Sequence, residues 1–208
     1  MTQHEQQIFL EVEYAEAKEC ANWLAIMYDL CFVIDATERL CGLLTSDSQD
    51  NVIIKSLWSA ALVSYVRCFT SGKRRTKLDA AIFSDLPGDP LGTHQCYKDT
   101  RDKHVAHPVN SFEEIKIGIL VDDGNPDGQW FIAGMGHMRL DRMCDSMEGV
   151  EQLRRLAIFA LHCVESEVGR WREATLEKAR ALKRSELARL KSVRMKPQGG
   201  ADAARKPR

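Results

Sequence analysis

Four side chains that suit chemistry on a phosphodiester lie close together near the middle of the chain. The stretch "YKDTRDKHVAHPVN", residues 97–110, contains Arg101, Asp102, His104 and His107. Histidine titrates near neutral pH and can give or take a proton, while arginine offers a fixed charge and a two-pronged donor for phosphate oxygens. Cutting RNA without a metal needs a base for the 2′-hydroxyl, an acid for the leaving 5′-oxygen and a cation for the charge that develops on the phosphate. These residue types therefore suit metal-independent RNA cleavage.

The spacing allows these side chains to face one cleft. On an α-helix, positions 101, 104 and 107 advance by about 60° each, so they cover about a third of the circumference. His107 precedes Pro108 and is expected at the helix C-terminus, where a protonated imidazole is stabilised and could act as the acid. Asp102 would orient Arg101 or fix a histidine tautomer. An arginine followed by a histidine six residues later is also a loose pattern, so a solvated helix face is the alternative.

Most elements that must position these residues are predicted to be helical. Apolar residues recur with a helical period over residues 4–44, 51–69 and 90–106. The helix over residues 51–69 is apolar over much of its circumference, which predicts a central helix, and Asp50 can cap it. A last, long helix is predicted over residues 147–194, and its second half is basic and only weakly apolar.

One β-hairpin is predicted between the motif and the last helix. The segments "IKIGILV" and "QWFIAGM" flank the turn-rich "DDGNPDG", which places the hairpin at about residues 115–140. The sequence therefore predicts an all-α protein with a short β-hairpin insertion and a long C-terminal helix. We expect a single domain over residues 1–196 and a disordered basic tail over residues 197–208.

The segment "RDKHVAH" resembles the arginine-to-histidine motif of the HEPN superfamily, and "LWSAALVSYVRCFTSGKR" is similar to the core helix of its abortive-infection branch. The resemblance covers residues 51–168. It implies a bundle of four or five helices, a homodimer whose two motifs meet, and metal-independent endoribonuclease activity with Arg101, Asp102 and His107 as catalytic residues. Many members are toxins of toxin–antitoxin or phage-defence systems, which implies an antitoxin protein as a partner, and some members are inactive. The five residues between Arg101 and His107 are within the family's range without being its commonest spacing, and the hairpin and basic last helix are additions.

Other residues are assigned supporting or binding roles. His104 would shape the cleft, Arg67 would contact phosphate or cap its helix, and Tyr97 would stack on a base or belong to the core. His162 lies on an apolar stripe and is expected to be a core histidine. The charge is asymmetric, with an acidic segment over residues 1–50 and basic clusters at "GKRRTK" and beyond residue 170. This pattern fits RNA contacts at the basic clusters, and it fits equally well a pairing of the acidic and basic ends within one chain or between two copies. The residues chosen from these clusters are Lys73, Arg74, Arg184 and Arg189.

No metal or other cofactor is expected. His94 and His104 would be about 15 Å apart along one helix, too far to share a zinc ion. The glycines of "IAGMGH" open no helix, which argues against a dinucleotide site.

Composition favours a soluble protein of a reducing compartment. The 208 residues carry a formal net charge of −1, and 44% of them are hydrophobic. Asp29 and Asp35 interrupt the most apolar stretch, which is short for a membrane span. The seven cysteines are odd in number and irregularly spaced, so a disulfide framework is not expected. These features predict a cytoplasmic protein without membrane contact.

Overall fold

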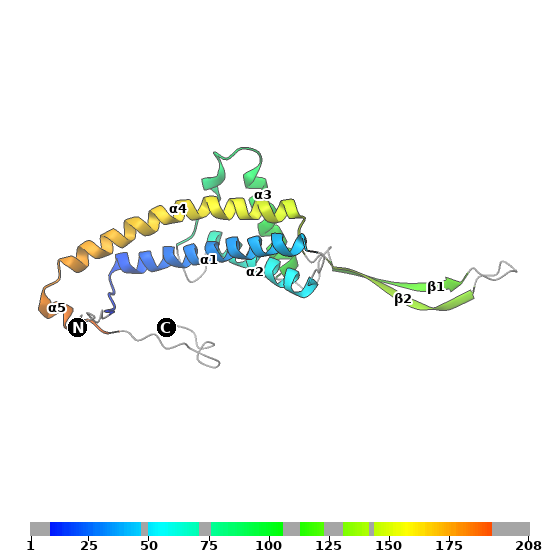
Figure 1. The fold of residues 1–208 in the computed structure, drawn as a ribbon, viewed down its shortest axis with the longest axis horizontal. Coiled ribbons are helices and arrows are strands. Elements are labelled where there is room, and N and C mark those ends of the chain that lie inside the picture. The colour runs from blue at the N-terminus through cyan, green and yellow to red at the C-terminus, as the bar shows by residue number, and fades with distance from the viewer. Residues whose placement is uncertain are drawn as a thin grey trace. The chain divides into compact units, whose positions relative to one another are not determined.

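The computed structural model describes residues 9–46, 50–70, 76–105, 113–122, 131–141 and 144–192. This part of the chain is mostly helical with one small two-stranded antiparallel sheet, as the sequence predicted (Figure 1). The elements in order are α1 (Ala15–Leu44), α2 (Asn51–Phe69), a 3₁₀ helix η1 (Ala80–Phe83), α3 (Pro90–Thr100), a π-helical turn η2 (Arg101–Val105), β1 (Glu113–Asp122), β2 (Phe131–Asp141), α4 (Met147–Arg180) and α5 (Arg184–Leu187).

The chain divides into two compact units. One comprises residues 22–167, and the other comprises residues 1–21 together with 168–208. Because α1 and α4 both cross the boundary, each contributes to both units. The prediction of a single domain over residues 1–196 stays a prediction, and the tail over residues 197–208 lies outside the described residues.

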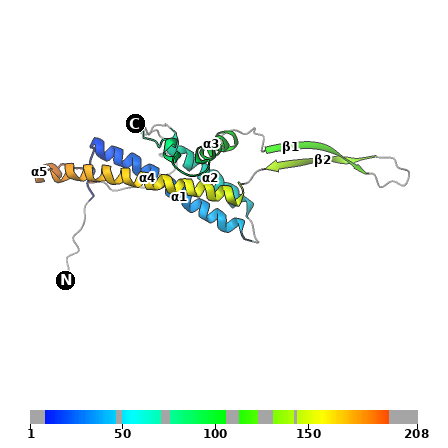
Figure 2. The ribbon, with the colours of Figure 1, turned by 90° about the horizontal axis from the view of Figure 1, so that it is seen from above.

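Helix α2 is a major part of the core of the larger unit, as its apolar circumference predicted. Asp50 caps it, because its Oδ1 accepts hydrogen bonds from the backbone N–H groups of Val52 and Ile53. Helices α1, α3 and α4 also contribute buried side chains to this core, and the ribbons of these helices are drawn in Figure 2. The fully buried large side chains of this unit are Ile26, Leu30, Val33, Leu40, Leu62, Tyr65, Val66, Phe83, Leu153, Val150 and Val164.

The smaller unit holds an extended segment where the sequence predicted helix. The first predicted helix was to begin at residue 4, but α1 begins at Ala15 and residues 11–14 are not helical. The Glu11 N–H donates to the Lys191 carbonyl at 2.9 Å, and Leu10 forms an isolated antiparallel bridge with Ser192. These bonds hold the segment extended, so the helical period there was misleading.

The last helix is shorter than predicted. Helix α4 ends at Arg180, and after a break the single turn α5 follows. The Lys183 N–H donates to the Glu186 carboxylate at 2.7 Å, which starts a new helix at this point. The second half of the predicted helix is weakly apolar, so little packing energy is available to keep it continuous.

The predicted hairpin is confirmed, with slightly longer strands. β1 and β2 pair antiparallel from Glu113 opposite Asp141 to Asp122 opposite Phe131. The register changes between Leu120 and Val121, because Leu120 pairs with Gly134 and Val121 pairs with Ile132. One extra residue, Ala133, therefore forms a bulge on β2.

Two described helices are long and apolar enough, by length and composition, to cross a membrane. They are α1 and α2, and 28% and 39% of their apolar windows are buried inside the protein. A core helix of a soluble protein or an N-terminal signal sequence meets the same criterion, so this property is weak support for a membrane location.

Candidate functional site

Helix α3 leads into the predicted catalytic segment and begins at a well-formed cap. Asp89 Oδ1 accepts a hydrogen bond of 2.9 Å from the Gly92 N–H, and Pro90 occupies the first turn, where its missing N–H costs nothing. The sequence predicted one helix to about residue 106. Instead the α-helix ends at Thr100, and residues 101–105 form a π-helical turn. Such turns are rare and occur frequently at functional sites.

Two buried side chains fix α3 against neighbouring helices. The Tyr97 hydroxyl donates to the Gly149 carbonyl at 2.6 Å, which ties α3 to α4. His94 Nδ1 is hydrogen-bonded to the Tyr65 hydroxyl at 2.9 Å, which ties α3 to α2. Burial raises the pKa values of both tyrosines, and burial followed by the nearby Lys98 charge lowers the pKa of His94. His94 is therefore held neutral near pH 7.

Arg101 lies where the α-helix changes into the π-turn. Its Nη1 is 3.1 Å from Asp102 Oδ1, and the two side chains are 26% and 47% exposed. The Arg101 Nε is buried and has no hydrogen-bond partner among the described residues. An unpaired buried N–H costs about 1–3 kcal/mol, so the position of this arginine lowers the stability of the folded protein. The pair presents a partly desolvated cation whose orientation a carboxylate helps to set.

The structure describes only part of the predicted constellation. The backbone of His104 lies in the π-turn η2. His107, Lys73 and Arg74 lie outside the described residues. Of the predicted catalytic residues, the structure therefore brings together Arg101 and Asp102.

Two predicted supporting residues are engaged elsewhere. The Arg67 guanidinium forms a two-pronged ion pair with Asp29 of α1, in which Nε is 3.0 Å from Oδ2. The hydrogen bond that Arg67 donates to Asp29 raises the pKa of Arg67. Tyr97 is only 2% exposed and packs edge-on against Trp58 and Tyr65, so it occupies the core, which was one of the two roles considered for it. No local pattern indicates Asp29 as the partner of Arg67, because it lies 38 residues away.

The predicted RNA-binding arginines Arg184 and Arg189 belong to the smaller unit, and both are exposed. Nearby basic residues are neutralised within this unit, since Lys178 contacts Glu16 at 2.6 Å and Arg180 contacts Glu173 at 3.0 Å. Exposure leaves Arg184 and Arg189 accessible to a polyanion.

Among the described residues, no group of three or more histidine, cysteine, aspartate or glutamate side chains could hold a metal ion. All seven cysteines are described, and all are free thiols. Burial is the main cause that raises the pKa values of Cys31 and Cys41, so these thiols are poor nucleophiles at neutral pH.

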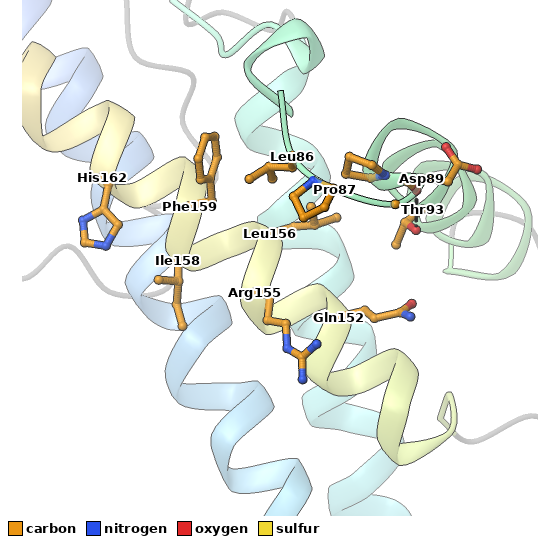
Figure 3. Close-up of a pocket in the computed structure, with 12 residues that line it drawn as sticks. Leu86, Pro87, Asp89, Thr93, Gln152, Arg155, Leu156, Ile158, Phe159 and His162 are labelled. Carbon is orange, nitrogen blue, oxygen red and sulfur yellow. Dashed lines mark hydrogen bonds between the residues drawn. The ribbon is translucent and has the colours of Figure 1, made fainter. Parts of the chain in front are cut away.

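A cavity of about 520 Å³ lies between the segment that precedes α3 and the outer face of α4 (Figure 3). Its apolar lining includes Leu86, Pro87, Leu156, Ile158 and Phe159. His162 at its edge was expected in the core, but its side chain is 72% exposed and pairs with Glu165 at 3.3 Å. The prediction was wrong because positions 155, 158 and 162 lie on the cavity side of α4, beside the stripe that packs inward. None of the predicted catalytic residues lines this cavity.

Comparisons with family models, with curated proteins and with solved structures found no match for this chain.

Proposed function

We propose that this protein is a metal-independent endoribonuclease of HEPN type that works as a cytoplasmic homodimer. The observation that carries the proposal is the Arg101–Asp102 pair, at 3.1 Å, in the π-turn that ends α3. The resemblance of "RDKHVAH" to the family motif supports the same assignment, and the seven free cysteines fit a reducing compartment.

Partial burial makes Arg101 more effective as a stabiliser of negative charge. A charge interacts more strongly with an anion when little water surrounds the pair, and a cation already in position needs no reorganisation during the reaction. Asp102 fixes the guanidinium through Nη1 while its own carboxylate stays half exposed. Arg101 would then face the phosphate oxygens that gain charge as the reaction proceeds.

The proposed reaction is an internal transfer of the phosphodiester. A base removes the proton of the 2′-hydroxyl, the 2′-oxygen bonds to phosphorus, and the bond from phosphorus to the 5′-oxygen breaks. An acid, for which we propose His107, supplies the proton to the leaving 5′-oxygen. The products are a 2′,3′-cyclic phosphate and a 5′-hydroxyl. Each chain has one such Arg–His motif, so we propose that two copies combine to supply both proton-transfer groups.

RNA would be held by basic residues away from the reacting atoms. Lys73, Arg74, Arg184 and Arg189 are the proposed contacts, because phosphate neutralisation by such side chains supplies sequence-independent affinity. We therefore expect Arg184→Gln with Arg189→Gln to weaken RNA binding and to reduce its salt dependence, without changing the cleavage step at saturating RNA.

The test is incubation of the purified chain with mixed RNAs in EDTA. Fragments that end in 2′,3′-cyclic phosphate, absent with Arg101→Ala, are the expected result. Intact RNA at high enzyme concentration, with a folded protein, would contradict the proposal. A toxin role further predicts that expression arrests growth and that an antitoxin protein relieves the arrest.

A second function is the binding of RNA or a protein partner without cleavage. It is favoured because two residues that were expected to support the cleavage site have structural roles instead, since Arg67 pairs with Asp29 and Tyr97 is buried. Retention of RNA by the chain in a filter-binding assay, without product, would favour this second function.

A further inference from the structure

One stripe of α1 stays open to solvent along the larger unit. Exposed positions recur along it in alternating steps of four and three residues, which is the spacing of a seam along which two helices pack. We define the outer seam by these positions, which are Tyr28, Phe32, Asp35, Arg39, Gly42 and Ser46. The packed side of α1 is elsewhere, where Leu30, Val33 and Leu40 are fully buried. The outer seam therefore has the pattern of a helix-pairing surface, although its six residues are exposed in the single chain.

The two ends of the outer seam differ in shape. Tyr28 and Phe32 are 66% and 42% exposed, so two aromatic rings are open to water. At the other end, a hollow of about 530 Å³ is lined by Asp35, Glu38, Arg39, Gly42, Leu43 and Ser46. A Cβ added at Gly42 would meet no atom within 4 Å, although glycine within a helix costs about 0.5–1 kcal/mol relative to alanine. The packing of the described chain gives no reason for this glycine, whereas a side chain inserted from outside would give one.

The middle of the outer seam carries one charge of each sign. Asp35 and Arg39 lie one helical turn apart, and neither side chain forms an ion pair or a hydrogen bond with a described residue. Polar residues at seam positions fix the orientation and register of two paired helices. Glu38, beside the seam, is directed toward α4, where it lies 3.7 Å from Arg154. The seam thus presents an acid followed by a base, and it fits a partner that presents them in the reverse order.

We propose that two copies of this chain associate through the outer seam, with their α1 helices antiparallel about a twofold axis opposite residue 37. Antiparallel order places Asp35 opposite the partner's Arg39, and the twofold axis repeats this ion pair. The same register places Phe32 opposite the partner's Gly42, so each ring enters the hollow of the other copy. One surface therefore supplies the acid, the base, the ring and the hollow that a second copy of itself requires.

The two charges argue against other occupants. A parallel pair of α1 helices would bring Asp35 beside Asp35 and Arg39 beside Arg39, and like charges repel at such distances. A bilayer would have to take up both charged side chains, each at about 2.5–3.5 kcal/mol at its centre. A nucleic acid requires a basic surface, whereas one acid and one base cancel on this seam. A second copy in the reverse direction satisfies both charges.

This surface would serve the homodimer of the proposed function, but the inference does not depend on catalysis. Association is measured without RNA, so a chain that fails to cleave RNA can still dimerise through the outer seam. A failure of this surface and a failure of the ribonuclease proposal are therefore distinguishable.

Charge reversal on the outer seam provides the sharpest test. Asp35→Lys leaves two cations on the seam and Arg39→Glu leaves two anions, so each variant should repel its own copy. In sedimentation velocity of the full chain, the wild type should show a reversible dimer, and each variant should have a dissociation constant about tenfold higher or more. An equimolar mixture of the two variants should restore the dimer, because cations then face anions. Arg155→Glu makes the same charge change at an α4 side chain that is 76% exposed, and it should stay within about twofold of the wild type.

The shape of the seam gives an independent test. Gly42→Leu fills the hollow, and its Cβ meets no atom of the same chain, so the helix should be at least as stable while the dissociation constant rises about tenfold. Phe32→Ala should weaken the dimer similarly. Combining it with Gly42→Leu should add little, because both changes remove the same contact. Circular dichroism at low concentration checks that each variant is folded.

Several results would overturn the inference. A wild-type chain that stays monomeric at the highest accessible concentration would do so. A mixture of the two folded charge variants that stays monomeric would show that Asp35 and Arg39 do not face each other. A dimer that none of these changes weakens would place the contact elsewhere, and it would leave the assignment of Arg101 unchanged. Flotation with neutral vesicles that Phe32→Ala abolishes, without any dimer in solution, would assign the seam to lipid.

Discussion

The hydroxyl of Tyr97 donates a hydrogen bond of 2.6 Å to the carbonyl of Gly149, and this bond joins the helix that leads into Arg101 to the start of α4. Tyr97→Phe removes the donor while keeping the ring that packs against Trp58 and Tyr65. The Gly149 carbonyl then loses one hydrogen bond but keeps its place in the hydrogen-bond ladder of α4, so we expect the free energy of unfolding to fall by about 0.5–1.5 kcal/mol. Urea titration followed by circular dichroism measures it.

Tyr28→Phe is the control for this substitution. Tyr28 is 66% exposed on α1, so its loss of a hydroxyl should change the unfolding free energy by less than about 0.5 kcal/mol. Equal effects of the two substitutions would mean that the bond between Tyr97 and Gly149 contributes nothing to stability.

A second prediction concerns the pH dependence of stability. His94 is 5% exposed, and burial together with the Lys98 charge lowers its pKa in the folded protein. Below about pH 6.5 the unfolded chain takes up a proton on this histidine that the folded chain refuses, so the unfolded state is favoured. Stability should therefore fall as the pH is lowered from about 6.5 toward the folded pKa, by up to about 1.4 kcal/mol per pH unit from this residue.

Urea titrations at a series of pH values between 5 and 8 test this expectation. His94→Asn should be less stable at every pH but should lose this component of the slope. His162→Asn alters a histidine that is 72% exposed and should retain the wild-type slope. A wild-type slope in His94→Asn would show that another group causes the pH dependence.

A third prediction separates the two roles considered for Arg67. Its guanidinium pairs with Asp29, whose side chain is 12% exposed, while that of Arg67 is 59% exposed. A double-mutant cycle with Arg67→Gln and Asp29→Asn should give a coupling energy of about 0.5–1 kcal/mol, which decreases with salt because one partner is largely exposed. Arg67→Gln should not change RNA affinity if the arginine is structural. A loss of affinity with a smaller salt slope would instead assign it to phosphate binding.

Features that depend on neighbouring residues were predicted from the sequence, and the π-turn was not. The Asp50 cap and the hairpin were predictable, because a capping side chain and a turn between apolar strands act through near neighbours. The π-turn after Thr100 was not, since a helical period assumes about 100° per residue and that value does not hold through residues 101–105. The same assumption underlies the estimate that positions 101, 104 and 107 share a third of a helix.

Long-range pairings were also beyond local pattern. The packing of separate helices brings together Asp29 and Arg67, and likewise Tyr97 and Gly149. The sequence around one residue of such a pair does not indicate which residue will be its partner. The extended segment before α1 was also not predicted, because it depends on long-range contacts. Its apolar residues have a helical period, but backbone hydrogen bonds with residues 191 and 192 hold it extended.

The last prediction concerns the proposed catalytic residues. Arg101→Ala removes a donor aimed at developing charge and should lower the cleavage rate about 10²–10³-fold. His107→Ala removes the proposed acid and should lower it about 10²–10⁴-fold, while His104→Ala should cost less. Asp102→Asn keeps the shape of the side chain but weakens its hold on Arg101, so we expect an intermediate loss. Rates are measured by single-turnover cleavage of a labelled RNA in EDTA.

Matched controls come from the exposed face of α4. Arg155→Ala and His162→Ala remove the same two residue types at side chains that are 76% and 72% exposed and lie away from η2 in the sequence. They should cleave at the wild-type rate, and all variants should keep a melting temperature close to that of the wild type. If Arg101→Ala and His107→Ala also cleave at that rate, the assignment of the site is wrong. If instead both unfold, the arginine that is paired with Asp102 at the end of α3 holds the fold together rather than an RNA phosphate.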